Sequence, residues 1–247
     1  MTRLTRLHTT QNSTHNNKRR LSKVIKKSIA IYAMSAIAVL SFNYSALAGN
    51  KAPQDKMVMI AEHALHTMIL GEGEFTVIFE SGFGNDLSHW RKVAPVISKK
   101  AKVVAYSRAG YGKSDSIAKP RTLTETTKEL SELIKAANLQ PPFIFVGHSY
   151  GSHIIRTYAA QNSDEVAGLI FVDPANEAFF VNLKALDKAK TNEFLNIYEK
   201  MIPEKLRAES KILMAIDKRG ALPDFGPLPD VPAAIITTMV PKHPPLI

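Results

Sequence analysis

The stretch Phe143-Ile-Phe-Val-Gly-His-Ser-Tyr-Gly-Ser-His-Ile-Ile155 joins an apolar run to a helix-like pattern through a Gly-x-Ser-x-Gly sequence. The run Phe143–Val146 consists of apolar, mostly β-favouring residues, and apolar residues recur at helical spacing from Ile154 to Ala159. Strand, tight turn and helix, in that order, form the context in which a Gly-x-Ser-x-Gly turn presents its serine. We therefore expect Ser149 to stand on a sharp bend at the end of a strand.

The rest of the chain alternates apolar runs with helical patterns. The runs expected to form strands lie at residues 57–60, 66–70, 75–79, 102–106, 143–146, 169–172 and 233–238. The central runs are continuously apolar, which is typical of parallel strands that are covered on both faces. Thr122-Leu-Thr-Glu125 indicates a capping box at a helix start, and residues 178–219 look helical before a loop over 220–232. This alternation predicts an α/β domain with a mostly parallel sheet and helices on both faces.

The turn around Ser149 has the residues that a nucleophile needs. A serine hydroxyl is a poor nucleophile unless it is exposed, aimed and placed next to a base. Glycines at Gly147 and Gly151 relieve crowding in the turn, because a Cβ there would collide with the adjoining strand or helix. The start of the following helix adds a partial positive charge that favours an oxyanion.

A second glycine-rich turn, Ser81-Gly-Phe-Gly-Asn85, follows the strand expected at 75–79. Such a turn at a strand end is able to present a backbone amide to developing negative charge, although it also occurs as an ordinary turn. Because the Ser149 turn is also present, presentation of a backbone amide is favoured over an ordinary turn. We expect the amides of Phe83 and Tyr150 to form an oxyanion hole.

The N-terminus has the three parts of a secretory signal peptide. Residues 1–27 carry eight positive charges and no acidic residue, residues 28–40 are uncharged and mostly apolar, and Ala46-Leu-Ala48 ends the segment. The apolar run is shorter than the roughly 20 residues that a spanning helix needs. We expect cleavage after Ala48, no stable membrane span, and export of a domain at 49–247 to the periplasm or the medium.

The formal net charge of +10 comes mainly from this N-terminal segment. The remainder is close to neutral, so no basic face for nucleic acid is expected. There are no cysteines, so the exported domain forms no disulfides. No cluster has metal-ligand spacing and no glycine pattern continues into a phosphate-binding loop, so we expect neither a metal nor a cofactor.

The order of the motifs is similar to that of the α/β-hydrolase superfamily. The matching landmarks are Ser81-Gly-Phe-Gly-Asn85, Trp90, Val103-Val-Ala-Tyr-Ser-Arg-Ala-Gly-Tyr-Gly-Lys-Ser114, Gly147-His-Ser-Tyr-Gly151 and Phe171-Val-Asp-Pro174, and they span residues 57 to about 240. The family pattern often has Asp where Ser107 stands, at a site that is usually structural. The resemblance implies the α/β-hydrolase fold, a lid segment at about 178–225, and a Ser-acid-His triad with Ser149 as nucleophile.

The resemblance also bears on the acid and the base. In most of the family the acid follows the strand after the lid, but no carboxylate follows residues 233–238 here. Some members carry it one strand earlier, which matches Asp173; a structural aspartate beside a proline is the alternative. The family's base follows a further strand, whereas His243, the only late histidine, comes directly after the last expected one. The resemblance therefore predicts a chain without the family's last strand and helix, and without its base.

Three other histidines lie near the Ser149 turn in sequence or in the expected fold. His148 lies inside the turn and flanks the nucleophile, and His153 should point away from the target of Ser149. His89 precedes the turn, against family order, and could line the site.

The resemblance implies a serine hydrolase that cleaves an ester or related acyl bond of a small molecule through an acyl-enzyme intermediate. An aspartate-nucleophile relative is disfavoured because the turn carries Ser149. The alternative is a catalytically impaired or non-catalytic protein of the hydrolase fold, with a binding role or none.

Overall fold

The computed structural model describes residues 55–61, 63–117 and 121–237 of the chain. The expected signal peptide and His243 lie outside these residues. The described residues form two compact units, of which one is Asn182–Met201 and the other holds the remaining described residues.

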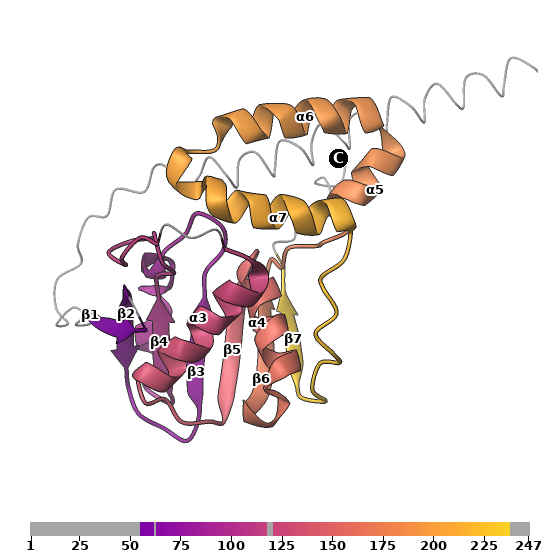
Figure 1. Cartoon of the computed structure of the whole chain (residues 1–247). Helices are drawn as coiled ribbons and strands as arrows, with labels where there is room; N and C mark the ends of the chain where they lie inside the picture. Colours follow the sequence, from indigo (N-terminus) through magenta and orange to yellow (C-terminus); the bar gives the residue numbers. More distant parts are fainter. Residues whose placement is uncertain (1–54, 62, 118–120, 238–247) are drawn as a thin grey trace, which may run out of the picture. The chain divides into compact units, whose positions relative to one another are not determined.

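One seven-stranded sheet organises the larger unit, in the order β1-β2-β4-β3-β5-β6-β7 (Figure 1). Its strands are β1 (Asp55–Ile60), β2 (His63–Leu70), β3 (Thr76–Glu80), β4 (Lys102–Tyr106), β5 (Phe143–His148), β6 (Val166–Val172) and β7 (Ala233–Ile236). β1 pairs with β2 and β2 with β4 in antiparallel fashion, and all the other pairs are parallel. The mostly parallel sheet predicted from the apolar runs is confirmed.

The continuous apolar character of the central strands follows from burial on both faces. On β3, Ile78 belongs to one buried cluster, while Val77 and Phe79 belong to another. Successive side chains of a strand point to opposite faces, so the two clusters are the cores on the two sides of the sheet. β4 alternates in the same way, with Val104 in the first cluster and Val103 in the second.

Helices cover both faces. α3 (Leu123–Ala136) and α4 (Gly151–Gln161) pack side by side on the face that holds Ile78 (Figure 1). The 3-10 helix η2 (Leu87–Trp90) and the short helix α2 (Ala94–Ile97) contribute to the core on the other face. α3 begins with the expected capping box: Glu125 N donates to Thr122 Oγ1 at 3.2 Å, and Thr122 N donates to the Glu125 carboxylate at 2.6 Å.

The segment expected to be helical contains α5 (Phe179–Leu186), α6 (Lys188–Met201), the 3-10 helix η4 (Glu204–Leu206) and α7 (Arg207–Arg219). A further 3-10 helix, η3 (Ser163–Glu165), precedes β6. α7 ends where Gly220 adopts a left-handed conformation with φ 71°, a position that suits glycine. No helix among the described residues is long and apolar enough to cross a membrane.

Candidate active site

Ser149 occupies the bend between β5 and α4, in a left-handed conformation with φ 47°. Its amide donates to the carbonyl of Val172 at 3.1 Å, and its own carbonyl accepts from the amide of Ala175 at 3.2 Å. The Ser152 hydroxyl donates to the same carbonyl at 2.5 Å. A left-handed conformation costs a non-glycine residue about 1–2 kcal/mol, so these bonds to the end of β6 and the first turn of α4 hold a strained residue in place.

The flanking glycines are required by close contacts. A Cβ at Gly151 would lie 2.5 Å from the carbonyl oxygen of Glu80, and a Cβ at Gly147 would lie 2.7 Å from Cδ1 of Ile155. Both distances are shorter than real Cβ contacts, so only glycine fits without a shift of its neighbours. The predicted reason for the glycines, crowding against the adjoining strand and helix, is confirmed.

The Ser81–Asn85 turn lies directly against the bend. A Cβ on Gly82 would lie 3.2 Å from Cβ of Ser149 and 2.7 Å from Nδ1 of His148. The turn is fixed on its other side by Trp90, whose Nε1 donates to the Ser81 hydroxyl at 2.9 Å. The two glycine-rich turns, which are far apart in sequence, therefore meet at the nucleophile position.

The two amides predicted for an oxyanion hole lie on these two turns. Phe83 follows Gly82, and Tyr150 immediately precedes the first residue of α4. Neither amide donates a hydrogen bond to another described residue. The arrangement leaves two backbone donors available near Ser149, and their role as an oxyanion hole stays a prediction.

Asp173 follows β6 and also has a left-handed backbone, with φ 41°. Its amide donates to the carbonyl of Ile236 at 2.8 Å, which ties it to the end of β7. Because Ser149 N bonds to the residue before it, Asp173 lies at the same edge of the sheet as the bend. Its carboxylate raises the pKa of His148, although less than burial lowers it. The structure brings Asp173 close to the turn, and its role as triad acid stays a prediction.

The histidines near the bend differ in exposure: His89 is exposed, His148 is half-buried and His153 is buried. The rings of His89 and His148 stack with centroids 5.3 Å apart. Burial lowers the pKa of both rings, and the neighbouring His89 lowers the pKa of His148 further. His153 lies one turn along α4, is 1% exposed, and has no partner for Nδ1 among the described residues.

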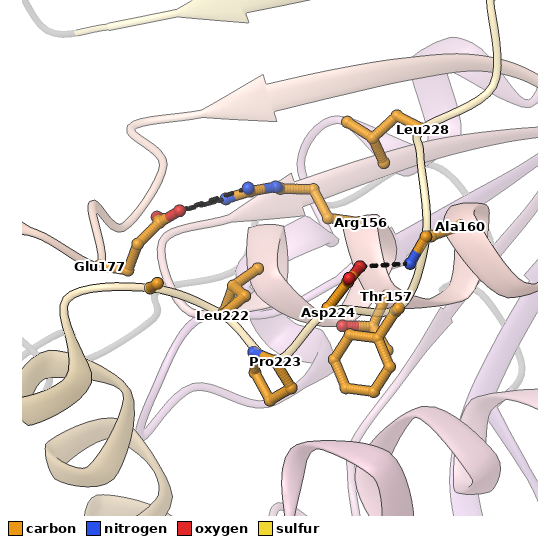
Figure 2. Close-up of a pocket in the computed structure, with 11 residues that line it drawn as sticks. Arg156, Thr157, Ala160, Glu177, Leu222, Pro223, Asp224 and Leu228 are labelled. Atoms are coloured by element: carbon orange, nitrogen blue, oxygen red, sulfur yellow. Dashed lines mark hydrogen bonds and ion pairs between the residues drawn. The ribbon is translucent and has the colours of Figure 1, made fainter.

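A cavity of about 350 Å³ lies elsewhere, between the second half of α4 and the loop 221–228 (Figure 2). Arg156 and Glu177 form an ion pair at its wall, with 3.2 Å between Nη1 and Oε1. Asp224 accepts a hydrogen bond from the amide of Gly226 at 3.0 Å. The residues predicted for catalysis do not line this cavity. Within the described part of the chain, no group of His, Cys, Asp or Glu is placed to hold a metal ion.

A buried ionic cluster beside the Ser81–Asn85 turn was not predicted from the sequence. The Arg108 guanidinium bonds to the carboxylates of Glu80 and Glu209, at 2.6 and 2.7 Å. All three side chains are at most 6% exposed. One signal was present in the sequence, because an acid that directly ends an apolar strand, as Glu80 does, needs a partner once buried. The partner on α7 has no local signal.

Comparison with known proteins supports the fold. The uncharacterised protein YqjL of Bacillus subtilis is 35% identical over 122 residues, which cover 49% of this chain and 48% of YqjL. An AB hydrolase superfamily protein of Gibberella zeae is 34% identical over 104 residues, covering 40% of this chain and 32% of that protein. The chain thus spans about half or less of the length of these curated relatives.

Solved structures agree at the level of the fold. The enol-lactonase from Burkholderia xenovorans LB400 superposes with a TM-score of 0.55 at 19% identity, covering 74% of this chain and 80% of that one. The epoxide hydrolase CorEH gives a TM-score of 0.54 at 17% identity, covering 74% and 81%. A family model described as the alpha/beta hydrolase fold matches residues 76–206, more than half of the sequence. With the strand order and the strained serine turn, this match shows that the chain belongs to the α/β-hydrolase family.

Proposed function

We propose that the protein is a serine hydrolase that cleaves an ester or related acyl bond of a small molecule. The observation that carries the proposal is the strained backbone of Ser149, with φ 47°, packed against the Gly82 turn. Strain of this kind persists where the surrounding structure over-determines it, and it concentrates at reactive positions. The same position carries a hydroxyl and adjoins two amides that bond to no other described residue.

The proposed reaction has two halves. Ser149 Oγ bonds to the acyl carbon while a general base takes the hydroxyl proton, and the amides of Phe83 and Tyr150 bind the oxyanion. The family's histidine is predicted to be missing, so this base is not assigned to a residue. The bond to the leaving alcohol breaks, and the alcohol takes the proton. Water then attacks the acyl-enzyme, which releases the acid and restores the serine hydroxyl. Asp173 orients the base in this scheme.

The test is covalent labelling of the full chain with a fluorophosphonate, read by mass spectrometry of the peptide that contains Ser149. We expect one label per chain on Ser149, no label in Ser149→Ala, and full labelling in the control Ser131→Ala, which removes a serine on α3. A panel of esters then identifies the acyl group that turns over. A folded protein that takes no label at Ser149 would refute the proposal and favour a non-catalytic, binding role.

We propose in addition that the protein is exported, with cleavage after Ala48. The support is the basic, apolar and small-residue pattern of residues 1–48. N-terminal sequencing of the protein from the periplasm or medium should begin at Gly49. Recovery of the uncleaved chain from the cytoplasm alone would contradict export.

A further inference from the structure

Arg108 lies at the junction of the two turns that form the candidate active site. It follows β4 by two residues and is 1% exposed. Its guanidinium donates to the carbonyl of Ser81 at 2.6 Å and to the carbonyl of Gly82 at 3.0 Å. These are the two residues directly before Phe83, so the guanidinium fixes the peptide planes that lead to the Phe83 amide.

The same guanidinium also contacts the other turn. Its central carbon lies 5.4 Å from the ring centroid of Tyr150 and 5.2 Å from that of Tyr111. Cations within about 6 Å of an aromatic face are attracted to it, more strongly where water is absent. Tyr150 itself is fully buried. Arg108 therefore contacts Tyr150 and the two residues directly before Phe83. The proposed function uses the amides of Tyr150 and Phe83.

Every N–H of Arg108 has an acceptor. Nε and one Nη2 hydrogen go to the two oxygens of Glu209, at 2.7 and 3.0 Å. The Nη1 hydrogens go to Glu80 and to the Ser81 carbonyl, and the second Nη2 hydrogen goes to Gly82. A guanidinium has five N–H donors in a fixed planar fork, so this acceptor set defines its orientation completely.

Glu209 lies in the first turn of α7 and is 5% exposed. Its carboxylate accepts from Nε and Nη2 of Arg108, and it also accepts from the hydroxyl of Tyr111. The carboxylates of Glu209 and Glu80 outweigh the effect of burial on Arg108 and raise the pKa of the guanidinium, which stays charged. α7 therefore fixes the orientation of Arg108 through Glu209. Arg108 in turn holds the Ser81–Asn85 turn, which carries the Phe83 amide.

We infer that Arg108 and Glu209 are positioning residues that hold the amides of Phe83 and Tyr150 in place for the oxyanion. The inference rests on the proposed function of those amides. Both side chains are buried, so the pair acts through the turn. It also makes the activity depend on how α7 is anchored.

Glu209→Gln is the informative substitution, since it keeps the shape of the side chain. It replaces one acceptor oxygen with an amide N–H₂ group, which faces an N–H of Arg108 or the hydroxyl of Tyr111. One donor of the fork is then left without an acceptor, and the guanidinium is free to tilt away from the carbonyls of Ser81 and Gly82. Arg108→Lys removes the fork altogether and should have the larger effect.

Two measurements separate positioning from loss of fold. The first is the ratio of kcat/KM for an ester to that for the matching thionoester, which reports on the oxyanion donors and does not depend on how much enzyme is folded. We expect kcat for the ester to fall at least about tenfold in Glu209→Gln, with KM little changed and a smaller ratio. The second is hydrogen–deuterium exchange of peptides covering residues 81–86, which we expect to become faster.

The matched control is Glu129→Gln. Glu129 is also a buried acid, 4% exposed. It pairs with Arg121 at 2.7 Å and accepts from the amide of Ala109 at 3.2 Å, but it bonds to neither turn. This variant should lose stability yet keep the ester-to-thionoester ratio and the exchange rate of 81–86. Unchanged exchange at 81–86 in both Glu209→Gln and Arg108→Lys overturns the inference, as does faster exchange with an unchanged ratio. If the wild type has no activity but exchange still quickens, positioning of the turn holds and the proposed function fails.

Discussion

The buried ring of His153 is expected to lower the free energy of unfolding in acid. The ring lies in α4, is 1% exposed, and packs edge-on against Tyr150 with centroids 6.2 Å apart. The pKa of His153 falls from 6.5 to about 4, because burial of the ring outweighs the opposing effect of Glu177 and Arg156 adds a smaller lowering effect. The folded protein therefore keeps His153 neutral at a pH where the unfolded chain protonates it.

The sign and size of the effect follow from linkage. Because the pKa is depressed in the folded state, stability falls as the pH drops below 6.5 and stops falling below about 4. Each pKa unit corresponds to about 1.4 kcal/mol, so the difference between folded and unfolded pKa values gives roughly 3 kcal/mol at full protonation. Between pH 7.5 and pH 5, His153 should cost about 2 kcal/mol of the free energy of unfolding.

The test compares the wild type with His153→Gln and His153→Phe in urea denaturation at pH 7.5 and pH 5, followed by the fluorescence of Trp90. Each variant loses or gains packing energy, but that change is the same at both pH values. We expect the wild type to lose about 2 kcal/mol more than either variant on acidification. Other titrating groups, including His89 and His148, are shared and cancel. Parallel losses in all three proteins would refute the assignment of a depressed pKa to His153.

Three further predictions concern the turn and its ionic cluster. Ser149→Gly should be more stable than Ser149→Ala by about 1 kcal/mol in chemical denaturation, because glycine tolerates φ 47°; equal stabilities would mean that the position is unstrained. Gly151→Ala places a Cβ 2.5 Å from the Glu80 carbonyl oxygen and should cost about 1–3 kcal/mol, seen as a lower Tm; a native Tm would show that the turn has room. Burial raises the pKa of Glu80, so the folded state binds this proton more tightly than the unfolded state does. On acidification towards pH 4.5, the wild type should gain stability relative to Glu80→Gln in urea titrations, and a constant difference would contradict the raised pKa.

The sequence predicted the sheet well because its signal is local. The apolar runs at 75–79, 102–106 and 143–146 correspond to β3, β4 and β5 within two residues at each end. Both faces of these strands are buried, so the positions of each run are apolar except Thr76 and Lys102, which begin β3 and β4. The short helices η2 and α2 were not predicted, because four residues are too few to show a 3.6-residue period.

The geometry of the candidate site was predicted only where its sequence signal is local. Ser149 and its glycines occupy one pentapeptide, so the constraints of the turn are visible in five consecutive residues. The cluster around Arg108 joins residues 101 positions apart in the chain, and no local pattern pairs Arg108 with Glu209. Such a contact is set by where α7 lies relative to β4, which periodicity does not encode.

Two of the non-glycine residues with a left-handed backbone lie together at the candidate site. Ser149 and Asp173 both have left-handed backbones, and both stand directly after parallel strands that are neighbours in the sheet. The bond from Ser149 N to Val172 O couples the two bends, so that neither relaxes without moving the other. Glycine, asparagine and aspartate tolerate such positions best, so Ser149 is the more strained of the two residues. The strained serine and the neighbouring aspartate lie on bends that are coupled through Val172, which supports the proposal that their hydroxyl and carboxylate have roles beyond stability.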